Sequence, residues 1–309
     1  MSNTHRAVRF AEYGGPEVLG VEEVTSPDPG PGEVLVRVHA AGINPIDWKL
    51  REGLVRSILP VELPAVPGAD IAGVVVAVGA DVTGFAAGDE VFGSIGTGGY
   101  AELAIARADQ LAVKPAGLAW DTAAAMPVVV NTAYAVLAEL DVRAGQTLLV
   151  DGAAGGVGAV AVQLARHLGA RVIGTAGERN HDYLRGLGAE PTTYGDGLVD
   201  RVRALAPDGV DAAFDTAGQG SVPALIELTG KPDRVATIAD FTAGGLGARV
   251  VSAAGPELPD RLAKAAALVL DGTLAITVAR VFPLAEAAAA QEESRGGHVR
   301  GKLVLSITG

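Results

Sequence analysis

The chain has 309 residues, of which 49% are hydrophobic and 19% are charged, a composition typical of a globular protein long enough for two domains. Its formal net charge of −12 and the lack of any basic run argue against recognition of a nucleic-acid backbone. The first residues contain no apolar targeting segment, and no stretch of about 18 uninterrupted apolar residues occurs. We therefore expect a cytoplasmic protein that binds neither nucleic acid nor membrane.

The sequence contains no cysteine, which excludes disulfides, a thiolate nucleophile and any zinc site that needs cysteine ligands. Its five histidines are scattered and form neither an H-x-x-x-H nor an H-E-x-x-H pair. No serine occupies the centre of a G-x-S-x-G turn. We therefore expect neither a bound metal nor a serine nucleophile.

Up to about residue 115 the chain alternates short strand-like runs with glycine- and proline-rich turns. The runs that predict strands cover residues 34–38, 71–78, 91–92, 100–105 and 111–114. Short strands at this spacing favour a partly closed β-barrel.

The pattern changes after residues 115–117. Asp121 is expected to cap a helix through residues 123–125, Pro127 to interrupt it, and a second helix to cover residues 132–140. From residue 147 strands and helices alternate, which predicts a doubly wound parallel sheet with helices on both faces. The expected strands are 148–150, 171–175, 210–215, 234–238 and 248–252, and the expected helices are 180–187, 198–205, 221–228 and 257–271.

The C-terminal segment is again strand-like at residues 276–281 and 302–307, on either side of an alanine-rich helix over 284–293. By themselves these strands could extend either domain.

The most informative turn lies at residues 152–158, G-A-A-G-G-V-G, between the apolar strand 148–150 and a helical pattern that runs to residue 168. Gly152, Gly155 and Gly158 stand where a side chain would block a sharp turn, the approach of a phosphate, or close packing of helix on strand. The free amides and the positive end of the helix would then face an anion. This context predicts a dinucleotide site.

Further motifs follow one another along the whole chain, and in this order they resemble the zinc-free quinone oxidoreductases of the medium-chain dehydrogenase/reductase superfamily, the zeta-crystallin-like branch. They are G-I-N-P-I-D at 42–47, P-G-A-D-I-A-G at 67–73, V-G at 78–79, G-D-E-V at 88–91, G-Y-A-E at 99–102, T-A-Y at 132–134, the glycine turn at 152–158, and G-K-L-V-L at 301–305.

The resemblance implies a GroES-like catalytic domain of residues 1–118 and 271–309 around a Rossmann cofactor domain of residues 119–270. Substrate and nicotinamide would meet in the cleft between them. Zinc-dependent relatives hold their metal through cysteine and histidine, a ligand set that this sequence cannot assemble. Relatives commonly pair through a sheet edge, for which the strand 248–252 is the candidate here, so a homodimer is expected.

The identity of the nicotinamide depends on the turn after the strand 171–175. Either Gly177 or Glu178 could take the position where an acidic residue selects NAD. We favour Gly177, because NADP-dependent members place a small residue there and a cation just after it. Arg179 would then bind the 2′-phosphate of NADPH, with Tyr194 as a second contact; in the alternative, Glu178 and Arg179 are solvated turn residues.

The resemblance places Asn44 beside the nicotinamide, with Asp47 and Trp48 facing the substrate. Trp48 could equally pack under its loop, and Asp47 could cap a short helix. The residues expected to contact the dinucleotide are Thr132, Gly152, Ala154, Gly155, Gly156, Val157, Gly158, Thr175, Gly177, Arg179, Tyr194, Thr216, Ala217, Ile238, Ala239 and Asp240.

The predicted function is NADPH-dependent reduction of a quinone or similarly conjugated carbonyl acceptor by hydride transfer, without zinc. An enoyl or enone reductase on the same scaffold is the first alternative. It is weakened because residues 48–56 lack the tyrosine that commonly serves as proton donor in enoyl-thioester reductases. A protein that binds dinucleotide without catalysis is the second alternative.

Overall fold

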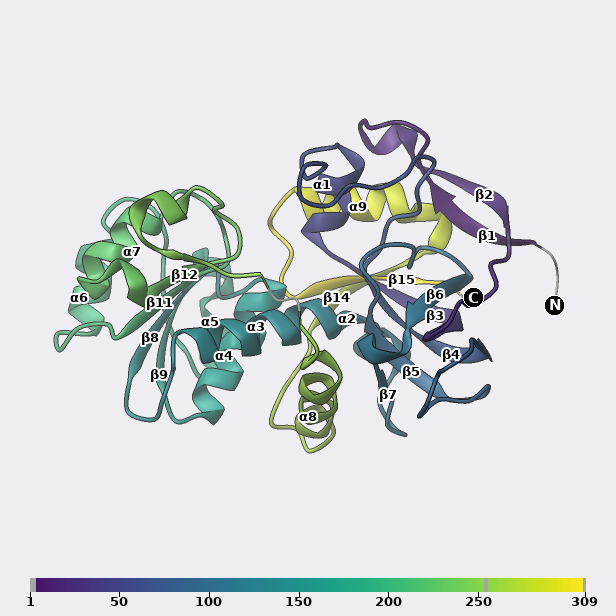
Figure 1. Cartoon of the computed structure of the whole chain (residues 1–309). Coiled ribbons are helices and arrows are strands. Elements are labelled where there is room, and N and C mark those ends of the chain that lie inside the picture. Colours follow the sequence, from purple (N-terminus) through teal and green to yellow (C-terminus); the bar gives the residue numbers. More distant parts are fainter. Residues whose placement is uncertain (1–3, 253–254, 308–309) are drawn as a thin grey trace. The chain divides into compact units, whose positions relative to one another are not determined.

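The computed structural model describes residues 4–252 and 255–307, which divide into two compact units (Figure 1). Within the described residues, the first unit contains the chain up to Val128, the segment Gly255–Asp271 and the residues from Ile276 onward. The second unit contains the residues from Val129 to 252 together with Gly272–Ala275.

The first unit is built on a seven-stranded sheet rich in β-branched residues. Its strand order is β14–β15–β3–β4–β5–β7, β6 pairs with β3, and every pairing is antiparallel except that of β14 with β15. The strands are β3 (Glu33–Ile43), β4 (Asp70–Val78), β5 (Glu90–Ser94), β6 (Leu103–Arg107), β7 (Leu111–Val113), β14 (Val278–Pro283) and β15 (Lys302–Ser306). A separate antiparallel hairpin joins β1 (Thr4–Arg9) to β2 (Gly20–Thr25).

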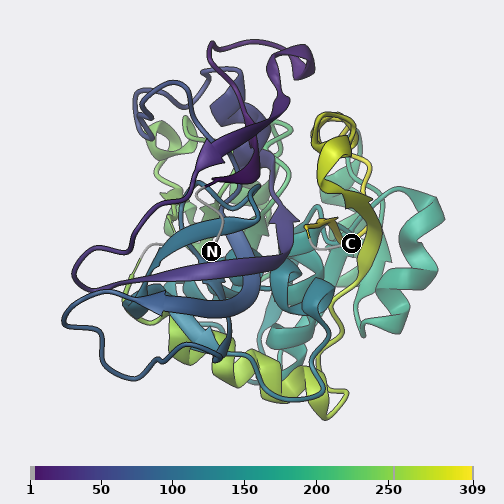
Figure 2. The same ribbon diagram turned by 90° about the vertical axis from the view of Figure 1, so that its right-hand side faces the viewer.

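The C-terminal strands belong to this first unit, as the resemblance implied. β15 pairs with β3, and Figure 2 shows the C-terminal segment, in yellow, returning to the strands of the N-terminal part. The helices of the unit are α1 (Pro45–Arg51), α2 (Trp120–Ala125), α8 (Leu258–Leu270) and α9 (Ala287–Arg295).

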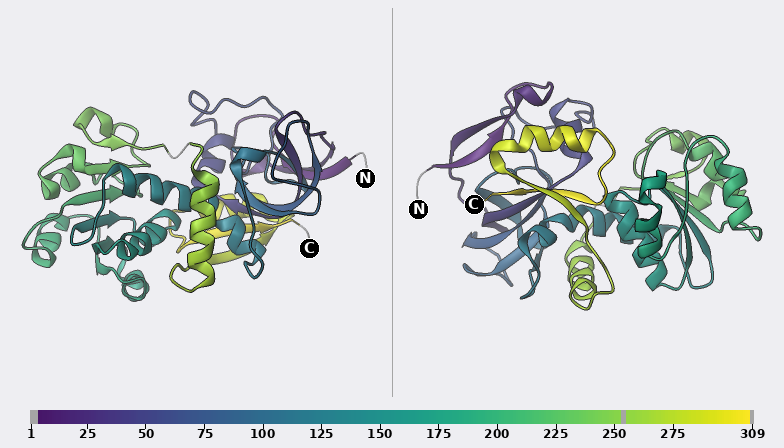
Figure 3. Two further views of the ribbon diagram at one scale, coloured as in Figure 1. Left: turned by 60° about the horizontal axis from the view of Figure 1, so that its bottom comes forward. Right: turned by 180° about the vertical axis from the view of Figure 1, so that it is seen from behind.

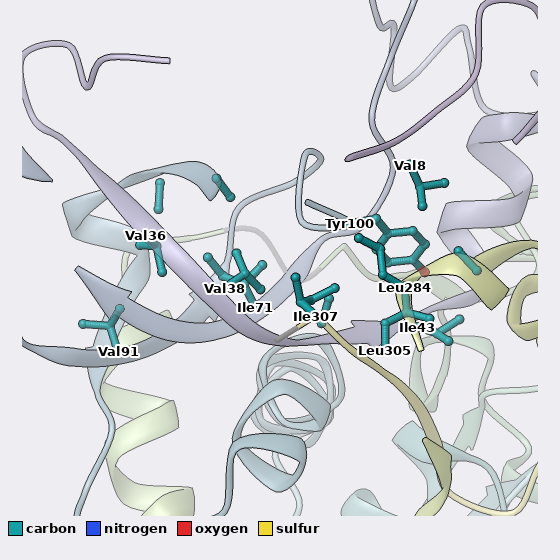
Figure 4. Packing of buried hydrophobic residues seen from close by; sticks show 14 of the residues in the cluster. Val8, Val36, Val38, Ile43, Ile71, Val91, Tyr100, Leu284, Leu305 and Ile307 are labelled. Atoms are coloured by element: carbon teal, nitrogen blue, oxygen red, sulfur yellow. The ribbon is translucent and has the colours of Figure 1, made fainter. Parts of the chain in front are cut away.

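The core of the first unit lies where the inward side chains of its strands meet (Figure 4). Val38 of β3 lies beside Ile71 of β4, Val36 lies further along β3 in the same cluster, and Leu305 of β15 lies near Ile43. Tyr100 is fully buried in the same cluster, so its hydroxyl needs a partner inside the protein.

The second unit contains a six-stranded, wholly parallel sheet with the order β10–β9–β8–β11–β12–β13. Its helices lie on both faces of the sheet (Figure 3). The strands are β8 (Thr147–Asp151), β9 (Arg171–Thr175), β10 (Glu190–Thr192), β11 (Ala212–Asp215), β12 (Val235–Thr237) and β13 (Arg249–Val250). The helices are α3 (Pro127–Glu139), α4 (Gly156–His167), α5 (His181–Gly186), α6 (Leu198–Leu205) and α7 (Val222–Thr229). The expected doubly wound sheet is therefore confirmed.

The division of the chain differs in two places from the expected boundaries at residues 118 and 270. α2 packs on β3 and β4, and α8 packs on β5 and β7, so both helices belong to the first unit. Apolar periodicity predicted these helices correctly, but it does not say which sheet a helix covers.

Some local predictions were wrong. Ala119, and not Asp121, is the N-cap of α2, and Pro127 begins α3, because a proline is tolerated where the helix has no amide to bond. The expected strand 100–105 is β6 at Leu103–Arg107, and the strands β1, β2 and β10 were not predicted. The helix α1 had appeared only as the short helix that Asp47 could cap. Among the described residues, no helix is long and apolar enough to cross a bilayer.

Candidate functional site

The glycine turn of the second unit connects β8 to α4, as the sequence predicts. Gly152 has φ of +78°, a conformation that favours glycine, and a Cβ on Gly158 would collide with the Gly152 carbonyl oxygen. A Cβ on Gly155, the N-cap of α4, would meet only that oxygen at 3.4 Å, so space beside Gly155 is free of protein atoms. The first amides of α4 have no intrahelical partner. The turn therefore fits the pyrophosphate of a dinucleotide.

Polar residues end the four central strands of the same sheet, and they pair across it. Thr175 at the end of β9 donates to the carboxylate of Asp151 at the end of β8, and the amide of Gly152 donates to Thr175 Oγ1 at 3.0 Å. Thr237 of β12 donates to Asp215 Oδ2 of β11 at 2.7 Å. All four residues are buried, so these bonds fix the strand ends rather than reach into solvent.

The same residues hold the loops that follow β11 and β12. Asp215 Oδ1 accepts the amides of Ala217 and Gly218, both at 2.9 Å. Thr237 Oγ1 accepts the amides of Ala239 and Asp240, at 3.1 and 3.0 Å.

The two loops lie against each other, since a Cβ on Gly218 would come within 2.8 Å of Ala239 Cβ. Thr216, at the start of the first loop, donates to the carbonyl of Asp151 at 2.7 Å. The structure thus brings Thr216, Ala217 and the residues 238–240 together at the carboxyl edge of the sheet. Thr132 lies buried on α3.

The turn after β9 presents the residues expected to select the nicotinamide. Glu178 and Arg179 are exposed, and within the described part of the chain neither side chain forms a hydrogen bond or an ion pair. Tyr194, 58% exposed, places its hydroxyl 4.0 Å from where a Cβ on Gly177 would lie. Gly177 and Tyr194 therefore lie close together beyond β9, and the exposed Arg179 follows two residues after Gly177.

Asn44 of the first unit lies at the end of β3, where it caps α1, and it is buried in a polar cluster. Its Nδ2 donates to Asp70 Oδ2 at 2.9 Å, and its Oδ1 accepts from Lys302 Nζ at 2.6 Å. Lys302 also donates to the carbonyl of Ile43 at 2.6 Å. Burial lowers the pKa of Lys302 and raises that of Asp70, while the attraction between them opposes both shifts.

Asp47, on the first turn of α1, belongs to the same cluster. Its Oδ2 accepts from the amide of Asn44 and from the hydroxyl of Tyr100, each at 2.8 Å. Burial raises its pKa to about 7, although both hydrogen bonds and Lys302 favour the ionised form. Of its two expected roles, the contacts of Asp47 are those of a buried helix cap.

Trp48 is half-buried, and its indole Nε1 has no hydrogen-bond partner among the described residues. The ammonium of Lys49 lies 5.5 Å from the ring centroid. In the described ranges, no group of three or more His, Cys, Asp or Glu side chains could hold a metal ion.

Comparison with known proteins matches both parts of the chain. The family profile of the alcohol dehydrogenase GroES-like domain matches residues 30–116, and the zinc-binding dehydrogenase profile matches residues 187–305. The chain is 32% identical to the chloroplastic quinone-oxidoreductase homolog of Spinacia oleracea and 33% identical to the quinone oxidoreductase of Sus scrofa, in both cases over 97% of each chain. It belongs to the quinone oxidoreductase branch of the medium-chain dehydrogenase/reductase superfamily.

Solved structures of this quinone oxidoreductase branch share the fold. The quinone oxidoreductase from Coxiella burnetii superposes with a TM-score of 0.86 at 33% identity, covering 99% of this chain and 100% of that one. The Escherichia coli quinone oxidoreductase complexed with NADPH has a TM-score of 0.88 at 27% identity and covers 98% of this chain and 100% of that one. The chain is thus an oxidoreductase with a dinucleotide-binding fold.

Six residues of the two polar clusters were not predicted from the sequence as part of the site: Asp70, Tyr100, Asp151, Asp215, Thr237 and Lys302. A usable signal existed for three of them, because Asp151, Asp215 and Thr237 each lie at or next to the end of a predicted strand. No local pattern indicated that Asp70 and Lys302 of the first unit contact Asn44, because strand pairing brings these residues together.

Proposed function

We propose that the protein is an NADPH-dependent quinone oxidoreductase that transfers a hydride to a quinone or similarly conjugated carbonyl acceptor without zinc. Bound NADPH would supply the hydride. The observation that carries the proposal is the unpaired cation of Arg179 beside the small residue Gly177, because a dianionic 2′-phosphate needs a free guanidinium and space. The Escherichia coli quinone oxidoreductase, which shares this fold, was solved in complex with NADPH, and this supports the proposal.

The residues of the second unit would bind and orient the dinucleotide without themselves reacting with it. The turn at Gly152–Gly158 takes the pyrophosphate, and the loops fixed by Asp215 and Thr237 form a rigid wall at the strand ends. Rigid placement of two reacting rings is the main contribution a protein makes to hydride transfer.

The proposal that no zinc ion takes part rests on the metal ligands that the chain contains. Cysteine is absent from the sequence, and the Asn44 carboxamide is already bonded to Asp70 and Lys302. A polarising metal is therefore not expected, and acceptors that take hydride without a Lewis acid are favoured.

An enone is the second candidate acceptor. The chain is 37% identical over 227 residues to the 2-methylene-furan-3-one reductase of Solanum lycopersicum, covering 70% of this chain and 58% of that protein. A quinone and an enone share a conjugated carbonyl, so one site can reduce both.

A homodimer is proposed from the edge of the parallel sheet. β13 is an edge strand, and Phe241, Leu246 and Val250 are large exposed hydrophobic residues on and just before it. An uncovered apolar edge invites pairing with a second copy. Light scattering should give twice the 31.1 kDa of one chain, and Val250→Lys should shift the mass toward the monomer; a monomeric wild type would refute the dimer.

The function is tested by NADPH and NADH oxidation against a panel of ortho- and para-quinones, enones and enoyl thioesters. Arg179→Ala should raise KM for NADPH about tenfold or more, because a charge-assisted contact contributes roughly 1.5–3 kcal/mol, and leave KM for NADH nearly unchanged. Arg203→Ala is the control, since Arg203 is also exposed in the second unit but pairs with Glu227. An unchanged KM for NADPH in Arg179→Ala would refute the NADPH assignment, and no turnover of any quinone or enone would refute the activity.

A further inference from the structure

Three neighbouring strands of the first unit bring Lys302, Asn44 and Asp70 together. β15 pairs with β3 so that Leu303 lies opposite Ile43, and β3 pairs with β4 so that Gly42 lies opposite Asp70. Lys302 directly precedes Leu303, and Asn44 directly follows Ile43, so both lie next to this pair. The sheet register therefore places a cation, a carboxamide and a carboxylate side by side.

The two neighbours of Asn44 determine which way its carboxamide points. An ammonium can only donate, so the atom that faces Lys302 at 2.6 Å must be Oδ1. The Asp70 oxygen 2.9 Å away on the other side accepts from Nδ2. Asn44 and Lys302 are 2% and 5% exposed, so water does not compete for these bonds.

Each neighbour is itself held by the backbone. Lys302 Nζ donates to the carbonyl of Ile43, and the Asp70 carboxylate accepts the amide of Val128 at 3.2 Å. The Asn44 carboxamide is thus clamped between two fixed charges of opposite sign, and the second hydrogen of Nδ2 is left pointing in one direction.

We propose that Lys302 is a positioning residue that fixes the Asn44 carboxamide, with Nδ2 as the donor and Oδ1 as the acceptor, in the one orientation that supports turnover. The inference rests on the proposed function for the part that concerns turnover. Without the ammonium, Oδ1 loses its donor and the carboxamide can rotate, so Oδ1 and Nδ2 exchange places for part of the time.

A purely structural role for Lys302 predicts a different outcome, and the chain offers a matched control. Lys114 is also a buried lysine of the first unit, 7% exposed, and its Nζ bonds to Glu90 at 2.6 Å away from Asn44. Lys302→Met and Lys114→Met both remove a buried ammonium, but only the first removes the donor to Asn44.

The orientation of Asn44 can be measured without any turnover. The chain has four asparagines, and with ¹⁵N-asparagine labelling the side-chain amide signal of Asn44 is assigned by its loss in Asn44→Asp. In Lys302→Met we expect this signal to shift and its hydrogen exchange to become at least tenfold faster, while Lys114→Met and Lys302→Arg leave it in place. An unchanged Asn44 signal in Lys302→Met overturns the proposal.

The consequence for the reaction is measured in the same variants. We expect kcat with a quinone or enone to fall at least tenfold in Lys302→Met, the NADPH Kd to stay within twofold, and Lys302→Arg to recover most of the loss. Lys302→Met should have no further effect on kcat in Asn44→Ala. A shifted Asn44 signal with unchanged kcat, or additive losses in the double variant, also overturns the proposal.

Two further outcomes are separable. If the wild type reduces neither quinones nor enones, the proposed function fails, while the amide signal still decides whether Lys302 fixes Asn44. If Lys302→Met does not fold, Lys302→Met/Asp70→Asn removes both buried charges and is compared with Asp70→Asn alone. The loss of the ammonium should then add its own shift of the Asn44 signal and its own loss of kcat, and identical results for the two variants overturn the proposal.

Discussion

The hydroxyl of Tyr100 donates a 2.8 Å hydrogen bond to Oδ2 of Asp47, the oxygen that also caps the amide of Asn44. Tyr100 and Asp47 are both buried, so a carboxylate on the first turn of α1 is solvated only by protein donors. Burial outweighs those donors, and the pKa of Asp47 rises to about 7.

Asp47→Asn should therefore change how stability depends on pH. Between the ordinary pKa of 3.8 and about 7, the folded wild type holds a proton on Asp47 that the unfolded chain has released. The contribution of this group to the free energy of unfolding falls as pH rises through that window, by up to about 4 kcal/mol. Because Asn does not titrate, the variant should gain stability relative to the wild type from pH 4 to pH 8.

Urea unfolding at several pH values measures this difference. The control is Asp109→Asn, since Asp109 is exposed and Arg107 lowers its pKa, so its contribution is lost only in acid. Parallel stability curves for the wild type and Asp47→Asn between pH 4 and pH 8 would contradict the assignment.

The sequence predicted the dinucleotide turn because everything that defines it is contiguous. Gly152, Gly155 and Gly158 lie within seven residues, between a strand and a helix that each show their own apolar pattern. Local sequence was therefore sufficient to predict the conformation of that half of the candidate site.

The Asn44 cluster could not be predicted in the same way. Asn44, Asp70 and Lys302 each lie in a motif that marked the family, but Lys302 and Asn44 are 258 positions apart. Their contact depends on the register of β15 on β3, which no local pattern determines. The same limit explains α8, whose periodicity predicts a helix but not the strands on which it packs.

Gly155 and Gly158 should respond differently to alanine. In Gly158→Ala the new Cβ strikes backbone atoms of Gly152 and Ala153, which cannot move without opening the turn, and we expect a loss of about 1–3 kcal/mol in unfolding free energy. In Gly155→Ala the Cβ meets protein only at 3.4 Å, so stability should stay near that of the wild type.

Dinucleotide binding separates the two effects. In the proposed site the Gly155 Cβ would occupy the space meant for the pyrophosphate, so Gly155→Ala should weaken NADPH binding at least tenfold while its Tm remains close to the wild-type value. Fluorescence titration with NADPH and thermal unfolding of the same samples measure both quantities. Tight NADPH binding by a folded Gly155→Ala protein would show that the phosphates do not lie at this turn.

Arg201 of α6 should influence NADPH affinity through Tyr194. Its guanidinium donates to the carbonyls of Thr193, Tyr194 and Asp196, with the bonds to Thr193 and Asp196 at 2.9 and 2.7 Å. These bonds hold the loop that places the exposed Tyr194 hydroxyl near Gly177. A lysine keeps the charge but offers one nitrogen in place of the two guanidinium nitrogens that bond Asp196 and Thr193 separately.

Arg201→Lys should therefore raise KM for NADPH roughly three- to tenfold, the equivalent of about one lost hydrogen bond, with kcat and KM for NADH nearly unchanged. If Arg201 acts by placing Tyr194, the substitution should have little further effect in Tyr194→Ala, since the side chain it positions is already gone. Steady-state measurements of KM for NADPH and NADH in the two single variants and the double variant test this prediction, with Arg203→Ala as the control on the same helix. Equal losses for NADPH and NADH in Arg201→Lys would indicate a general loosening of the second unit instead of a role in recognising the 2′-phosphate.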